Sequence, residues 1–115
     1  MNIPVYDLIG DVCMTYEDGA RLQETFRKAF EGGETVELDF AKTRIFVTPF
    51  FNASVGPLLE KFSKDEVRER LKFLNLPPAA FEPLRHSVEN AERYYNDPGY
   101  REALDKVLEH LAEEA

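Results

Sequence analysis

The sequence has little of what most enzymatic and metal-binding sites need: one cysteine, two histidines and no tryptophan among 115 residues. A single cysteine cannot form an internal disulfide, so nothing indicates an oxidising compartment. Cys13, His86 and His110 lie far apart and lack the spacing of metal ligands. The pair Gly32 and Gly33 precedes a predicted strand, which is the wrong context for a phosphate-binding loop. We therefore expect no metal, no cofactor and no catalytic residues.

Long apolar runs and basic residues are also scarce. No stretch of about 18 apolar residues is present, which argues against a membrane-spanning helix. Residues 1–7 lack the basic start and apolar stretch of a secretion signal, so we expect a cytoplasmic protein. Fourteen Lys and Arg stand against 22 Asp and Glu, a formal net charge of −8. Direct binding to nucleic acid is not expected, because it needs clustered cations.

What is present suits one soluble globular domain spanning residues 1–115. Hydrophobic residues make up 43% of the chain and charged residues 31%, and this length can bury a core without disulfides. Residues 3–9 are β-branched and aromatic and predict a strand that ends at Gly10. Residues 12–14 predict a short second strand. Thr15 predicts the N-cap of a helix with an apolar stripe of Leu22, Phe26, Ala29 and Phe30.

The middle of the chain predicts a strand, a bend and a helix. Residues 36–40 alternate apolar and acidic side chains, and residues 45–47 extend the apolar run. Pro49 interrupts that run, which predicts a bend over residues 48–54. A second helix is then predicted from its apolar stripe of Val55, Leu58, Leu59 and Phe62.

The last third is predicted to be mostly helical after one more strand. Ser63 is the predicted cap of a short helix. Residues 70–76 fit either a strand or a continuation of that helix, and the strand is favoured because Pro77 and Pro78 stop the run. Residues 73–115 are then mainly C-terminal helices, with Asp97 as the N-cap of the last one. The predicted fold is α/β: a small, mostly parallel four-stranded sheet packed with helices, two C-terminal helices in succession.

An ordered set of short motifs resembles one family over residues 3–76. The set comprises Glu17-Asp18-Gly19 with Leu22, Leu38-Asp39-Phe40, Val47-Thr48-Pro49, Phe51-Asn52, Val55-Gly56, Phe62-Ser63 and Leu74-Asn75-Leu76. It resembles the STAS domain of anti-sigma factor antagonists and anion transporters. The resemblance is closer to the bacterial STAS-like family of unknown function, DUF4325. A STAS-like α/β fold is what this resemblance implies.

The resemblance also implies a regulatory switch near residue 48. In anti-sigma factor antagonists, a histidine-kinase-like ATPase phosphorylates the serine of an Asp-Ser pair at the start of the second helix. Thr48 and Pro49 stand at the corresponding positions here, and Pro49 cannot accept a phosphate. Thr48 and Ser54 are the candidate phosphoacceptors, with helix capping as the alternative role of their hydroxyls. The candidate interaction surface comprises Thr48, Phe50, Asn52, Ser54 and Val55.

Three functional hypotheses follow. The first is a non-catalytic regulatory domain of bacterial signalling that binds a protein partner, either a histidine-kinase-like ATPase or another regulator. The second is a small-ligand-binding or enzymatic domain with a pocket near Gly19 and the strand ends. Gly19 is unusual in the first turn of a helix. Either another backbone or a ligand approaches closely there, or a frayed first turn simply tolerates the glycine. The third is a structural subunit of a homo-oligomer, for example a homodimer, or of a larger complex, assembled through the C-terminal helices.

Overall fold

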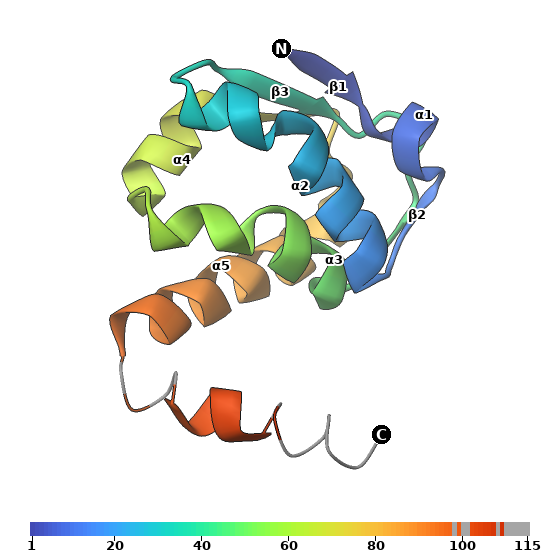
Figure 1. Cartoon of the computed structure of the whole chain (residues 1–115). Coiled ribbons are helices and arrows are strands. Elements are labelled where there is room, and N and C mark those ends of the chain that lie inside the picture. The colour runs from blue at the N-terminus through green and yellow to red at the C-terminus, as the bar shows by residue number, and fades with distance from the viewer. Residues whose placement is uncertain (98, 100–101, 108, 110–115) are drawn as a thin grey trace.

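Two short parallel sheets, rather than one, organise the fold (Figure 1). The computed structural model describes residues 1–97, 99, 102–107 and 109. Its larger sheet has the strand order β1 (Asn2–Pro4), β3 (Val36–Asp39), β5 (Leu71–Leu74). The smaller sheet pairs β2 (Val12–Cys13) with β4 (Ile45–Phe46). All pairs are parallel, which confirms the α/β class and the parallel pairing, whereas the expected single four-stranded sheet is wrong.

The same two stretches of chain supply strands to both sheets. Asn2 pairs with Glu37 in the larger sheet, and Val12 pairs with Ile45 in the smaller one. Val12 lies ten positions after Asn2, but Ile45 lies only eight positions after Glu37. The longer path winds into the helix α1 (Val5–Ile9), so the predicted strand over residues 3–9 is wrong beyond Pro4. The apolar residues of α1 have the helical spacing i, i+3, i+4, which the β-rich composition concealed.

The helix α2 (Tyr16–Glu31) is fixed at both ends. Thr15 is its N-cap, as predicted, and the Thr15 hydroxyl accepts a hydrogen bond from the Asp18 amide at 3.1 Å. At the other end, the Arg70 guanidinium donates to the carbonyl oxygens of Phe30 at 2.7 Å and Glu34 at 3.2 Å. The same guanidinium stacks 4.1 Å from the centre of the Phe30 ring. The Phe30 carbonyl also accepts from the Gly33 amide, so Arg70 adds a charged donor to the last turn of α2 and ties it to the loop that follows at Glu34.

A helix, not a bend, follows β4. The helix α3 (Thr48–Ser54) carries Pro49 in its first turn, where proline favours helix initiation because its missing N–H is not needed. The second predicted helix is instead the 3₁₀ segment η1 (Gly56–Glu60), since Pro57 lacks the amide that would continue α3. The predicted bend over residues 48–54 is therefore wrong, and the helix begins about two turns earlier than expected.

The remaining elements follow the prediction closely. The helix α4 (Lys64–Arg70) is capped by Ser63, whose hydroxyl accepts from the Glu66 amide at 3.1 Å. Residues 71–74 form the strand β5, as favoured, and α5 (Phe81–Asn96) follows the 3₁₀ segment η2 (Pro78–Ala80). Residues 102–107 are helical, while Pro98, which should begin the last helix, lies outside the described residues.

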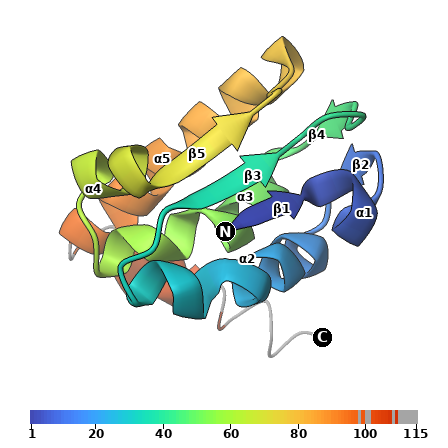
Figure 2. The ribbon, with the colours of Figure 1, turned by 90° about the horizontal axis from the view of Figure 1, so that it is seen from above.

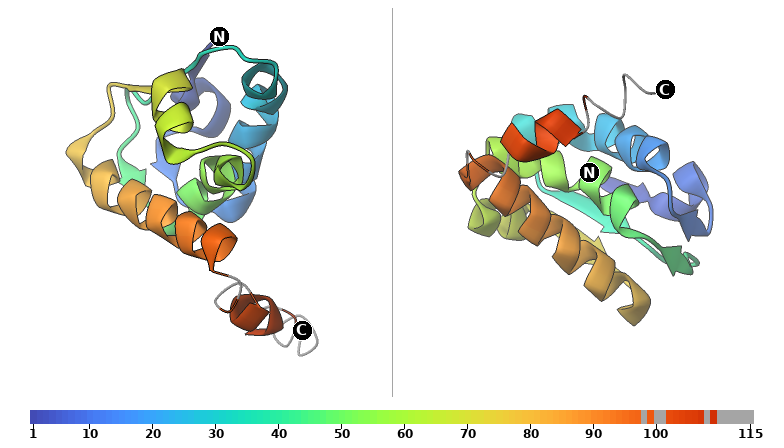
Figure 3. Two further views of the ribbon diagram at one scale, coloured as in Figure 1. Left: turned by 90° about the vertical axis from the view of Figure 1, so that its left-hand side faces the viewer. Right: turned by 90° about the horizontal axis from the view of Figure 1, so that it is seen from below.

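All the large helices cover one face of the three-stranded sheet (Figure 2). Ile3, Val36, Leu38 and Leu71 point into the core on that face, while Asn2 and Lys72 are exposed on the other. A ring cluster comprising Phe40, Phe46, Phe50, Phe51 and Phe73 joins the two sheets to α3. The helix α5 runs beside α3 and η1 (Figure 3). This packing decides which side of α3 meets solvent.

Candidate functional site

One side of α3 is part of the hydrophobic core. Phe50 and Ser54 have no exposed surface, and Val55, which follows the helix, is 2% exposed. The Ser54 hydroxyl donates to the Phe50 carbonyl at 3.0 Å, the usual way in which a buried helical serine is satisfied. These three residues therefore do not lie on a surface, which corrects their predicted placement. They face the core because residues 48–54 are helical instead of bent.

The other side of α3 meets solvent. Pro49 is exposed, and Thr48 and Asn52 are half-buried. The N-cap residue of α3 is Val47, so the Thr48 hydroxyl does not cap this helix. The Thr48 carbonyl accepts a hydrogen bond from the buried Ser87 hydroxyl at 3.0 Å, which ties the start of α3 to α5. Thr48 and Asn52 are the two predicted site residues that the structure leaves accessible.

A hollow of about 510 Å³, here named the α3 hollow, lies between this side of α3, η1 and α5. Its lining includes Tyr16, Pro49, Asn52, Asn90, Tyr94 and Leu104. None of its ten described lining residues is charged, although charged residues make up 31% of the chain. The Tyr94 hydroxyl donates to the Asp105 carboxylate at 2.6 Å, so the helical residues 102–107 border the hollow.

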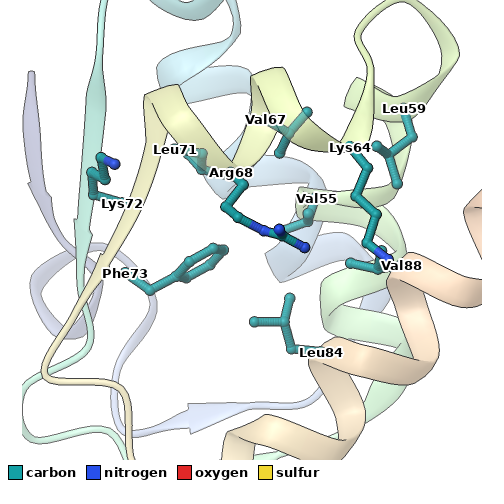
Figure 4. Close-up of a pocket in the computed structure, with 10 residues that line it drawn as sticks. All are labelled: Val55, Leu59, Lys64, Val67, Arg68, Leu71, Lys72, Phe73, Leu84 and Val88. Carbon is teal, nitrogen blue, oxygen red and sulfur yellow. The ribbon is translucent and has the colours of Figure 1, made fainter.

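A second hollow, here named the β5 hollow, has a volume of about 320 Å³ and lies between α4, β5 and α5 (Figure 4). Its apolar lining includes Val55, Leu59, Val67, Leu71, Leu84 and Val88. Lys64 and Arg68 reach over the hollow from α4, while Lys72 points away from the other side chains in Figure 4. The sequence analysis does not find this site, because it places Val55 and Leu59 in the buried stripe of a helix and gives the other lining residues no role. The signal was the spacing of Lys64 and Arg68, one turn apart on the same face of a short helix.

The pocket predicted near Gly19 is filled by protein. Gly19 is buried where α2 crosses α3, and a Cβ atom there would overlap the Phe50 carbonyl oxygen and lie 3.0 Å from the Ala53 Cβ atom. The close approach of a backbone therefore explains the glycine, and the predicted ligand position is wrong. A glycine in a helix commonly marks such a crossing.

At the carboxyl ends of β3 and β5, polar groups of the protein bind one another. Ligands of α/β folds often bind at this edge of the sheet. Here the Asp39 carboxylate accepts hydrogen bonds at 3.0 Å from both the Asn75 side-chain amide and the Ala41 backbone amide. These two bonds, first that of Asn75, lower the pKa of Asp39 below its ordinary value. The arrangement joins the ends of β3 and β5.

Comparison with known proteins decides the family. A family model described as a STAS-like domain of unknown function (DUF4325) matches residues 18–79, which is more than half of the chain. The chain belongs to the STAS-like DUF4325 family. The match runs from the first turn of α2 into η2 and includes α3 and α4, whereas β1, α1, β2 and all of α5 lie outside it. No curated protein and no solved structure matched the chain.

The one thiol of this STAS-like domain is held in its protonated form. Cys13 is fully buried, and burial, with smaller effects from the charges of Asp18 and Asp11, raises its pKa to about 12. A nucleophilic cysteine needs the opposite shift. His86 is exposed on α5, 3.6 Å from the Glu82 carboxylate, and His110 lies outside the described residues. Cys13 is therefore a packing residue.

Two further searches cover only the described part of the STAS-like domain. Within it, no three His, Cys, Asp or Glu side chains gather in a way that would hold a metal ion. Its helices are too short or too polar for any of them to cross a membrane.

Proposed function

We propose that this STAS-like domain is a non-catalytic regulatory module of bacterial signalling that binds a protein partner through its α3 surface. The α3 surface is defined as the exposed or half-buried residues Tyr16, Thr48, Pro49 and Asn52 around the α3 hollow. The observation that carries the proposal is that the described residues lining this hollow are all uncharged. A protein with a net charge of −8 and an uncharged, tyrosine-lined depression has the composition of an interface core.

Aromatic anchors support the same proposal. Tyr16 is 58% exposed at the start of α2, although it borders the hollow. Tyrosines are frequent hot spots of protein interfaces, because they bury a large area at a low cost in conformational entropy. Tyr94 and Tyr95 supply further aromatic surface from α5. A partner that fills the hollow would thus contact three tyrosines.

The family likeness suggests the class of partner and the form of regulation. We propose a histidine-kinase-like ATPase or a related regulator as the partner and Thr48 as the regulated residue. Thr48 lies in the first turn of α3 at the edge of the α3 surface. A phosphate there would add a charge of about −1.5 to −2 next to an uncharged interface, which disfavours association through desolvation. Ser54 is not part of this proposal, because a kinase cannot reach a fully buried hydroxyl.

Matched variants of exposed tyrosines test the proposal. The tagged full chain is used to capture partners from its bacterial host, with mass spectrometry for identification and for phosphate at Thr48. The captured protein is then purified and its affinity measured for the wild type, Tyr16→Glu and Tyr6→Glu. Tyr6 is a comparable tyrosine, 41% exposed on α1. We expect Tyr16→Glu to weaken binding at least tenfold and Tyr6→Glu to leave it unchanged.

Two results would contradict the proposal. Equal affinities of the three proteins would show that the partner binds elsewhere. Failure to recover any partner, together with a dimeric mass by light scattering, would favour the alternative in which the chain assembles with itself. A monomeric wild type whose partner is lost on Thr48→Glu substitution, but not on Thr48→Val substitution, would support both the surface and its regulation.

A further inference from the structure

The β5 hollow has a floor that is closed to water and walls that are open to it. Val55 and Leu71 are 2% exposed, and Val67 is 7% exposed. Leu84, Val88 and Phe73 form walls that are only half-buried. A volume of about 320 Å³ lies at the lower end of the range for small-molecule sites, which is roughly 300–1,000 Å³. The hollow therefore has the size and apolar character of a small-ligand site.

The charged groups that lean over this hollow are cations with weak partners. Arg68 lies 4.0 Å from Asp65, whose side chain is 94% exposed, and Lys64 lies 3.3 Å from Glu92. Exposed ion pairs of this kind contribute about 1 kcal/mol or less, so an incoming anion can displace them. Arg68 is the better anion contact, because Glu92 already offsets part of the charge of Lys64. A guanidinium also matches a carboxylate with two parallel hydrogen bonds.

An apolar track leads away from the cations along α5. Val88, Leu84 and Phe81 lie at the helical spacing of one face, and Phe81 is 56% exposed. Glu92, which contacts Lys64, lies 11 residues beyond Phe81, or about 16 Å along the helix axis. One end of the site is thus cationic and the other apolar. This polarity fits an elongated molecule with one anionic end.

The surroundings favour a small molecule over a protein segment. Asp65 and Glu69 are exposed on the outer side of α4, and Arg85 and Glu89 are exposed on the outer side of α5. A stable protein interface needs about 800 Å² on each partner, and its core is depleted in charge. The apolar surface here is confined to the hollow and its track, so it is too narrow for such an interface.

We propose that the β5 hollow binds a small anionic amphiphile, a carboxylate on a medium-length apolar chain. The carboxylate binds Arg68, with Lys64 beside it, and the chain lies along Val88 and Leu84 toward Phe81. This site is separate from the α3 surface and does not depend on a protein partner.

Calorimetry of the full chain with decanoate, octanoate and decanol tests the proposal. Because each buried methylene contributes about 0.8 kcal/mol, decanoate should bind about fifteenfold more tightly than octanoate. Decanol, which lacks the charge, should bind at least tenfold more weakly than decanoate. Amide spectra recorded during the titration should change at Val55, Leu84 and Val88. Arg68→Ala should weaken decanoate binding at least tenfold, whereas Arg85→Ala, on the outer side of α5, should not.

Several outcomes would overturn the proposal. These are the absence of saturable decanoate binding, equal affinities for decanoate and decanol, or spectral changes that map to the α3 hollow. Binding of an acidic amphipathic peptide at Leu84 and Val88 without binding of decanoate would also overturn it and would assign the hollow to a protein segment. The Leu84→Asp variant adds a second check, because its carboxylate should repel decanoate while circular dichroism reports whether the fold persists.

Discussion

Gly19 lies directly against the backbone carbonyl of Phe50, where α2 crosses α3. The contact is between two backbones, so neither side can move without shifting a whole helix. The crossing positions α3, and with it the side of that helix that we propose as an interaction surface. A glycine that looked out of place in a helix is therefore a requirement of the fold.

Replacement of Gly19 should reverse the effect expected from helix propensity. By propensity alone, Gly19→Ala would stabilise α2 by about 0.5–1 kcal/mol. Because the new methyl group would overlap the Phe50 carbonyl, we expect a loss of about 1–3 kcal/mol in the free energy of unfolding instead. Urea denaturation measures the change, and Ala20→Gly on the exposed side of α2 is the control for propensity. A stabilised Gly19→Ala protein would refute the close crossing.

Arg70 should be far more important to stability than Arg68, two residues before it. Arg70 is 17% exposed in its side chain and both caps α2 and stacks on Phe30, whereas Arg68 is 70% exposed. We expect Arg70→Met to lower the free energy of unfolding by about 2–3 kcal/mol, because it removes the charged donor of the Phe30 and Glu34 carbonyls. Arg68→Met should change it by less than about 0.5 kcal/mol. Chemical denaturation of both variants measures the difference, and equal losses would contradict the capping role.

The Cys13 thiol should be inert in the folded protein. We expect no reaction with a thiol reagent at pH 8 under native conditions and complete reaction in denaturant, read from the absorbance of the released thiolate. Since the folded pKa of about 12 exceeds the ordinary value of 9.0, the native state keeps the proton longer than the unfolded state. Stability from this group is therefore complete below about pH 9 and declines as the pH rises toward 12. In the Cys13→Ala variant, this part of the decline in stability with pH should be missing. Rapid reaction of Cys13 with the thiol reagent in the folded protein would contradict its burial.

Asn75 should control the titration of Asp39. Its amide is the main cause of the lowered pKa of Asp39, so Asn75→Gly should raise that pKa toward 3.8. Glycine is chosen because Asn75 has a φ of 54°, which glycine adopts without strain. The stability that Asp39 adds is present above pH 3.8 and is lost as the pH falls through its lowered folded-state pKa. Carboxyl-carbon NMR follows the titration. Asn2→Ala, whose amide contacts Glu37 instead, should leave Asp39 unchanged.

Much of the fold was readable from local signals in the sequence. Thr15 and Ser63 mark the starts of α2 and α4 because a hydroxyl followed by acidic residues in the first turn is a local, self-contained motif. The strand β5 was favoured over a helix because two prolines end the run. Parallel pairing followed from the alternation of strands and helices. The family resemblance was likewise visible in short motifs, each tied to a local element.

The features that were missed depend on contacts between distant segments. The sheet divides in two because the stretch from Asn2 to Val12, which contains α1, is two residues longer than the paired stretch from Glu37 to Ile45. No local sequence pattern indicates this difference. The sequence predicts a bend where the helix Thr48–Ser54 lies, because a proline after an apolar run indicates an interruption, whereas Pro49 stands in the first turn of a helix. That single error places Ser54 and Phe50 on the predicted surface, whereas both are buried in the structure. The phase of a helix decides which side chains are buried.

The pairing of both sheets from the same two chain stretches has a consequence for folding kinetics. Residues more than thirty positions apart must meet before either sheet can gain a hydrogen bond, and one closure of that loop aligns both pairs at once. The helix α2 fills most of the loop, so its early formation shortens the flexible chain that separates the pairing strands. The two sheets should then exchange their amide protons as one cooperative unit, despite the helical turn of α1 that separates them.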